Sequence, residues 1–217
     1  HASMGAYMFT GIHPQTGQLF KNQDTAHGGW GARLGADGAG PFKTLAHGDT
    51  LDIPVEVQEA LYPMRIDEYS VRTDSAGAGQ WRGGMGLNKQ YTVLSPCRLT
   101  TVFERSGCPP WGLFGGHAAE PGSVLLQSQG ASPRSVQKVS DLPLSPGDQL
   151  VIRSGGGGGY GEPWKRPVEA VLADVQSGYV SREAAQRDYG VVISEDGNVN
   201  LALTEKMRTQ LAGGEQE

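Results

Sequence analysis

The sequence predicts a mainly β fold whose α-helices are confined to the C-terminal part. Short segments of alternating apolar and polar residues, separated by turn residues, recur between residues 15 and 153. The chain has 33 glycines and 13 prolines in 217 residues, which favours turns and short strands. After residue 163 the apolar residues recur at helical spacing. We therefore expect an α+β protein: a glycine-rich β-sandwich or barrel-like domain over residues 5–163, and a helical segment with a small hairpin over residues 164–212, packed on that domain.

Seven or eight short strands are expected in the first domain. The N-terminal residues 5–34 predict short strands joined by turns. Residues 64–72 alternate with one phase slip, which indicates a β-bulge. The other expected strands are residues 80–94 with a glycine kink, 98–104, 123–127, 137–139 and 149–153.

The C-terminal segment predicts two short helices and a terminal one. Residues 166–178 have Pro167 in the first turn and Gly178 as the stop, and residues 181–190 begin with a Ser181 cap. Together they form an αα-hairpin. Residues 191–193 and 199–203 are then expected to pair as a small β-hairpin, and Thr204 to cap a last helix that ends at Leu211.

Five consecutive glycines, residues 155–159, are the most unusual feature of the chain. A glycine inside a regular element is about 0.5–1 kcal/mol less favourable than an alanine, so five in a row need a reason. Either the backbone adopts positive φ angles repeatedly, or another group approaches too closely for a Cβ. A glycine loop between a strand and a helix can also present N–H groups to an anion. The spacing matches no phosphate-binding motif, so a packed corner and a loop lining a site both stay open.

Charge and composition exclude several classes of partner. The net charge of −5 disfavours binding to nucleic acid, and no apolar segment approaches the roughly 18 residues of a membrane span. Cys97 and Cys108 show no metal or redox spacing, so a reducing, cytoplasmic location is expected. We expect no signal peptide, a cloning remnant at residues 1–4 and a disordered tail at residues 213–217.

Two groups in an acidic stretch are candidates for acid/base catalysis. Glu56 lies among Pro54 and two valines, where partial desolvation would raise the pKa of its carboxyl group. His47 and Asp49, on one strand face, could relay a proton or bind a metal. The alternative is a solvated loop followed by a short helix, with Glu56 and Glu59 on its outer face. We predict no metal site on this chain.

Two aromatic segments are candidates for binding. Arg33 follows a tryptophan flanked by glycines and is either an anion contact or a surface charge. Residues 108–116 form a proline-rich loop with Trp111, Leu113 and Phe114, which is either a surface for a partner or a lid over the core.

Ten short motifs, in order, carry a resemblance that covers most of the chain. They are Gly28-Gly-Trp30-Gly-Ala-Arg33, Asp37-Gly38, Pro54-Val-Glu56-Val57, Tyr62-Pro63, Asp74-Ser-Ala-Gly-Ala-Gly79, Arg82-Gly-Gly-Met-Gly86, Pro110-Trp-Gly-Leu-Phe-Gly-Gly116, Pro146-Gly-Asp148, the glycine run with Tyr160-Gly-Glu-Pro163, and Arg187-Asp-Tyr-Gly-Val191. In this pattern the chain resembles the hydantoinase B/oxoprolinase family, the B-type subunits of ATP-dependent N-methylhydantoinases, 5-oxoprolinases and the related acetone and acetophenone carboxylases.

The resemblance is to the C-terminal part of proteins more than twice as long. The family's metal-coordinating residues lie in the N-terminal part, which has no counterpart here. The resemblance implies a hetero-oligomer with an A-type ATP-binding subunit, which carries ATP and Mg, and with the N-terminal portion of a B-type subunit. No cofactor is predicted on this chain, and the chain alone is expected to be inactive.

The implied reaction has two stages. The A-type subunit phosphorylates an amide or enolate oxygen of a small-molecule substrate, and the B side completes hydrolysis of a cyclic amide. The alternatives are a subunit of an ATP-dependent ketone carboxylase and a non-catalytic assembly domain. For the phosphorylated intermediate, Arg33 or Arg82 with the backbone of Gly156, Gly157 and Gly158 are the expected ligands.

Overall fold

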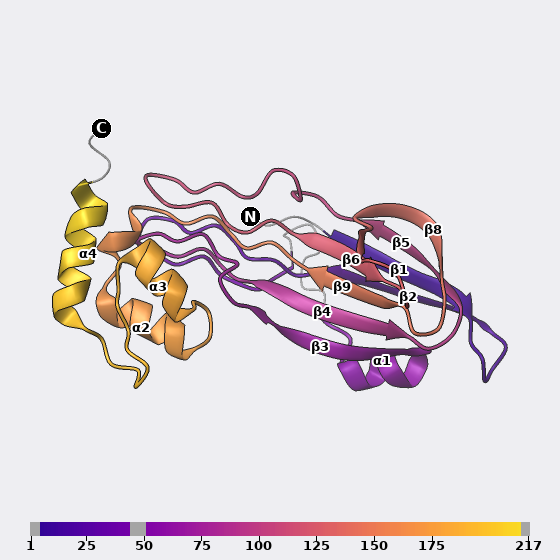
Figure 1. The fold of residues 1–217 in the computed structure, drawn as a ribbon. Helices are drawn as coiled ribbons and strands as arrows, with labels where there is room; N and C mark the ends of the chain where they lie inside the picture. The colour runs from indigo at the N-terminus through magenta and orange to yellow at the C-terminus, as the bar shows by residue number, and fades with distance from the viewer. Residues whose placement is uncertain (1–4, 44–50, 214–217) are drawn as a thin grey trace.

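Two antiparallel sheets form the larger part of the molecule (Figure 1). The computed structural model describes residues 5–43 and 51–213. The first sheet has the strand order β2 (Leu19–Ala26), β1 (Gly5–Ile12), β5 (Cys97–Val102) and β8 (Lys138–Leu144). The second has the order β3 (Met64–Arg72), β4 (Gly86–Val93), β9 (Gln149–Arg153), β6 (Ser123–Gln127) and β7 (Arg134–Ser135). The predicted mainly β fold with C-terminal helices is confirmed.

The core lies between the two sheets because alternate residues of each strand point inward. Tyr7, Phe9 and Leu99 come from the first sheet and meet Tyr91 and Leu150 of the second. The rings of Phe9 and Tyr91 are 5.3 Å apart, within the range in which aromatic pairs add to burial. Side chains from both sheets therefore form one continuous core.

Several strands begin and end where the sequence pattern places them. The bounds of β6 and β9 are the predicted ones, and the predicted bulge in β3 is a register shift between Ile66 and Glu68. The short helix α1 (Val55–Leu61) packs beside β3, with Gln58 buried. Its side chain donates to the carbonyl oxygen of Ile53 and accepts from the Tyr91 hydroxyl.

The helices α2 (Val168–Gln176), α3 (Arg182–Tyr189) and α4 (Leu201–Gly213) gather at one end of the molecule (Figure 1). A 3-10 turn, η2 (Pro163–Lys165), precedes them. The Ser181 hydroxyl accepts from the N–H of Ala184, and Gly190 ends α3 in the left-handed conformation, so both predicted caps are confirmed.

The expected hairpin after α3 is shorter than predicted. An antiparallel bridge joins Ile193 and Val199, and the N–H of Asn200 donates to the Val192 carbonyl, but the pairing stops there because α4 begins at Leu201. Asn200, not Thr204, caps this helix: its side-chain oxygen accepts from the N–H of Leu203. Thr204 lies inside α4, where its hydroxyl accepts from the N–H of Val192.

Four extended segments connect the sandwich to the helices, and we call them the glycine layer: residues 28–39, 75–85, 110–120 and 155–161. Figure 1 shows extended chains running side by side between the strands and the helices. Hydrogen bonds from the five-glycine segment reach the other three. Gly157 donates to Gly84, Gly159 donates to His117, and Gly155 accepts from Gly29, over 2.9–3.1 Å.

The glycines are required because backbone packs directly on backbone. A Cβ on Gly156, Gly157, Gly158 or Gly159 would lie 1.9–2.0 Å from a carbonyl oxygen of another segment. None of these four residues has a positive φ. The positive-φ explanation is therefore wrong and the close-approach explanation is confirmed. The same logic places glycine at the crowded axis of collagen.

Substitution of one of these glycines tests this packing. In Gly157→Ala, the new Cβ would lie 1.9 Å from the Trp30 carbonyl oxygen. We expect a loss at or above the upper end of the roughly 1–3 kcal/mol that overpacking costs. The free energy of unfolding in urea measures it. Gly107→Ala is the control, because nothing lies within 4 Å of its Cβ position. Equal stability of the two variants would contradict the packing argument.

Candidate functional site

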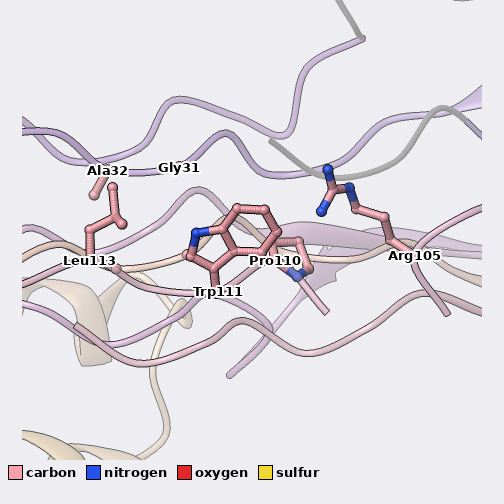
Figure 2. A pocket seen from close by; sticks show the side chains of 8 residues that line it. Gly31, Ala32, Arg105, Pro110, Trp111 and Leu113 are labelled. Atoms are coloured by element: carbon pink, nitrogen blue, oxygen red, sulfur yellow. The ribbon is translucent and has the colours of Figure 1, made fainter. Parts of the chain in front are cut away.

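A pocket of about 190 Å³ opens at the edge of the glycine layer. Figure 2 shows the Trp111 indole with Leu113 and Ala32 toward one end and Arg105 at the other. The lining residues are Gly31, Ala32, Arg105, Pro110, Trp111, Leu113, Gly158 and Gly159. The glycines contribute bare backbone to this lining, and the side chains are one aromatic ring, three apolar groups and one cation.

Strained backbone accompanies this pocket. In the described part of the chain, four non-glycine residues have positive φ, and two of these are Arg105 (φ 52°) and Phe114 (φ 53°). Such conformations persist only where the surroundings enforce them, and they concentrate at functional sites. Trp111 is 63% exposed, and the Arg105 guanidinium carbon lies 5.5 Å from the centre of its ring. The loop therefore presents both side chains to the outside.

The pocket is equipped for binding rather than for acid/base chemistry. Its lining contains a guanidinium and an indole, but no carboxylate or imidazole. The Gly158 carbonyl accepts from the N–H of Ala32, whereas the N–H of Gly158 has no hydrogen-bond partner among the described residues.

Arg82, an expected anion ligand, is instead part of the buried framework. Its guanidinium donates to the Gly83 carbonyl and lies 3.2 Å from the Asp174 carboxylate, an ion pair in which the N–H is not well directed. It also lies over the Tyr179 ring. The structure therefore places Arg82 in an ion pair with Asp174 and not among the residues that line the pocket.

Arg166 is the centre of the same buried network. It makes two 2.7 Å hydrogen bonds to Asp37 and a third to Asp174. Burial by itself would raise the pKa of the Asp37 carboxyl group, but the hydrogen bonds and charge of Arg166 outweigh burial and lower it. The network ties the helices to the glycine layer across 129 positions of sequence.

The other predicted site residues are not brought together. The N–H groups of Gly156 and Gly157 donate to Glu120 and Gly84, so these two cannot cradle an anion. Gly158 alone of the predicted glycines lines the pocket.

Two further predicted residues lie elsewhere. Arg33 is exposed in a tight turn with Ala36. Glu56 is exposed on α1, so the desolvation argument for it is wrong, and the alternative of a solvated helix face agrees with the structure. His47 and Asp49 lie outside the described residues.

A first polar cluster lies inside the sandwich. The buried Asp24 accepts from Lys89 at 2.8 Å, from the Tyr7 hydroxyl at 3.1 Å and from the N–H of Thr25 at 2.7 Å. Burial by itself would raise the pKa of Asp24, but Lys89 outweighs burial and lowers it. The Asp24 carboxylate thus accepts three hydrogen bonds from the protein itself, as buried polar groups in a structural role do.

A second polar cluster lies beside it. Asp52 lies 3.1 Å from His27 and 3.0 Å from Lys43, and it accepts from the Tyr69 hydroxyl. Burial lowers the pKa of the His27 imidazole, and the nearby Asp52 opposes this. The cavity there measures about 10 Å³, which is the space of one water and too small for a substrate.

Sequence reasoning missed Arg105 and the ion-pair network. Arg105 precedes an ordinary turn sequence, and nothing in the residue order reveals its positive φ. Within the described ranges, no group of three His, Cys, Asp or Glu residues is placed to hold a metal ion. Of the helices in those ranges, none has the length and apolarity needed to cross a membrane.

Comparison with known proteins identifies the family. The sequence model of the hydantoinase B/oxoprolinase family matches residues 1–163, so the chain belongs to this family. The chain is 36% identical to the caprolactamase subunit beta of Pseudomonas jessenii, covering 83% of this chain and 32% of that protein. It is 40% identical to an uncharacterised protein of Methanocaldococcus jannaschii, in a match that covers 73% of this chain and 28% of that protein. The chain thus spans about a third of these relatives.

Solved structures show the same fold. The crystal structure of the ATP-dependent caprolactamase from Pseudomonas jessenii matches 96% of this chain and 38% of that chain, with a TM-score of 0.77 and 29% identity. The nucleotide-free structure of an acetone carboxylase matches 96% of this chain and 32% of that chain, with a TM-score of 0.78 but 20% identity. The second likeness supports the fold alone.

Removal of the central arginine tests the ion-pair network. In Arg166→Met, Asp37 loses its bidentate partner and the buried Asp174 keeps only Arg82. We expect a loss of about 3–5 kcal/mol in the free energy of unfolding, as for other broken buried pairs. Arg187→Met breaks the exposed pair with Asp188 and should cost about 0–1 kcal/mol. Similar losses in both variants would show that the network adds no stability.

The buried His27 predicts a pH dependence of stability. Its pKa is lower in the folded than in the unfolded state, so the unfolded chain binds the proton first as the pH falls. The free energy of unfolding should be highest above the imidazole pKa of the unfolded chain, about 6.5. It should decrease as the pH falls from there toward the lower pKa that His27 has in the folded state. The charged groups around His27 are Asp52, Lys43, Asp24 and Lys89.

His27→Asn removes the imidazole and with it this contribution to the pH dependence of stability. Urea unfolding between pH 8 and pH 5 should then show a shallower decline than in the wild type. An unchanged or steeper decline would contradict the assignment.

Proposed function

We propose that this chain is part of an ATP-dependent cyclic-amide hydrolase of the hydantoinase and 5-oxoprolinase type. The observation that carries the proposal is the likeness to the ATP-dependent caprolactamase, which extends over 96% of the chain at 29% identity. The 36% identity to a caprolactamase subunit beta supports it independently of the structure.

The chain acts with other polypeptides in this proposal. It spans about a third of its relatives, and its pocket offers binding groups without a general acid or base. The remaining groups therefore come from the N-terminal portion of a B-type subunit and from an A-type subunit that binds ATP and Mg. Phosphorylation of the amide oxygen converts a poor leaving group into a good one. Because ATP is abundant in the cytoplasm, we propose that the assembly is cytoplasmic. We also propose that the chain alone is inactive.

The exposed aromatic loop supplies a contact surface for such an assembly. Trp111, Leu113 and Phe114 are 63%, 48% and 74% exposed, and a monomer rarely exposes three large apolar side chains so close together. We therefore favour the partner-surface interpretation of residues 108–116 over the lid.

Reconstitution tests the function. The chain is mixed with the cognate A-type subunit and the N-terminal B-type portion, and supplied with ATP and hydantoin, 5-oxoproline or caprolactam. We expect ring-opened acid in proportion to ATP consumed, and none when this chain is omitted. Ring opening that continues without the chain would refute the proposal. Turnover of only a ketone with bicarbonate would instead assign the chain to the carboxylase branch.

Two substitutions separate a catalytic from an assembly role. Glu56→Ala and His47→Ala are assayed in the reconstituted complex, with the exposed Glu195→Ala as the control. A fall in kcat with intact assembly would support the predicted catalytic role. We expect unchanged kcat for Glu56→Ala, since that carboxylate is exposed on α1 and is not part of the pocket lining.

A further inference from the structure

We propose that the pocket beside Trp111 binds a small oxyanion attached to a flat group, with Arg105 as the anion ligand and the Trp111 indole as the stacking surface. The physiological ligand, a substrate or its phosphorylated form, rests on the proposed function. The binding chemistry itself rests only on the residues that line the pocket.

The Arg105 side chain is available to a ligand. Among the described residues, none forms a side-chain hydrogen bond or ion pair with it, and its guanidinium carbon lies 5.5 Å from the centre of the Trp111 ring. Arg72, Arg82, Arg166 and Arg208, by contrast, all donate to carbonyl or carboxylate oxygens of the protein. A guanidinium presents a planar fork that matches the two oxygens of a carboxylate or phosphoryl group.

The remaining lining favours an anion. No carboxylate lines the pocket, so none repels a negative charge. The backbone of Gly158 also lines the pocket, and no described residue accepts a hydrogen bond from its N–H. The strained backbone at Arg105 fixes where its side chain leaves the loop.

The size and shape favour a ring. The volume of about 190 Å³ exceeds the roughly 150 Å³ of an engineered cavity that holds benzene. Trp111 offers an exposed aromatic face, and Pro110 and Leu113 add apolar walls. A flat group can therefore stack on the indole while its oxyanion reaches Arg105 (Figure 2).

The oxyanion could come from two sources, a carboxylate on the substrate or a phosphoryl group. The probes are accordingly benzoate, phenylphosphonate and inorganic phosphate, with neutral benzamide as the uncharged analogue. Binding to the isolated chain is followed by NMR, through the Trp111 indole N–H and the Gly158 amide. Tighter binding of benzoate would assign the carboxylate as the source, and tighter binding of phenylphosphonate the phosphoryl group.

Substitutions assign the roles of the two side chains. Arg105→Ala should weaken binding of the preferred ring-bearing anion by about ten- to hundredfold, since hydrogen bonds to charged groups are strong. Arg105→Lys should restore part of that loss. Trp111→Leu should weaken binding of benzoate and phenylphosphonate but leave inorganic phosphate unchanged. Arg134→Ala, which removes an exposed arginine of β7, should change nothing.

Three results would overturn the proposal. The first is benzamide binding as tightly as the anions, because then the charge has no role. The second is anion binding that Arg105→Ala leaves intact. The third is no response of Trp111 and Gly158 to any probe. The assay needs neither ATP nor a partner, so failure of the reconstituted hydrolase would not affect it. Conversely, an active complex with an unresponsive pocket would reject this site and retain the proposed function.

Discussion

The direct contact of one backbone with another is the constraint on which the rest of this structure depends. A Cβ added to Gly157 would lie 1.9 Å from the carbonyl oxygen of Trp30. A Cβ added to Gly159 would lie 2.0 Å from the carbonyl oxygen of Ala78. Segments packed at such short distances exclude water, so their polar groups must form hydrogen bonds with one another. The hydrogen bonds between segments achieve this, since a buried unpaired group costs about 1–3 kcal/mol.

This constraint also organises the features that surround the glycine layer. On one side, Arg166 and Arg82 bridge two aspartates and hold the helices in place. At its edge, Gly158 and Gly159 contribute bare backbone to the lining of the pocket beside Trp111. The loop that carries Trp111 is itself hydrogen-bonded to the five-glycine segment through Leu113. Binding surface and scaffold are therefore continuous.

Sequence patterns predicted the parts of the fold that side chains encode. Alternation located β6 and β9, and a phase slip located the bulge in β3, because inward and outward residues differ in polarity. The segments of the glycine layer are joined by backbone hydrogen bonds, which no periodicity of side chains reports. Pairing of Arg166 with Asp37 depends on tertiary proximity alone. The motifs identified the family, whereas the location of the pocket required the positions of Arg105 and Gly158 in space.

Amide hydrogen exchange of the five-glycine segment tests the central claim most directly, because it reports whether these backbone hydrogen bonds are closed in solution. The N–H of Gly157 donates to Gly84 over 2.9 Å and is buried. We expect it to exchange as slowly as the amides of β9 in the sandwich. Exchange as fast as that of the exposed Gly107 would show that the segment is a loose loop, and would contradict the account of a packed glycine layer.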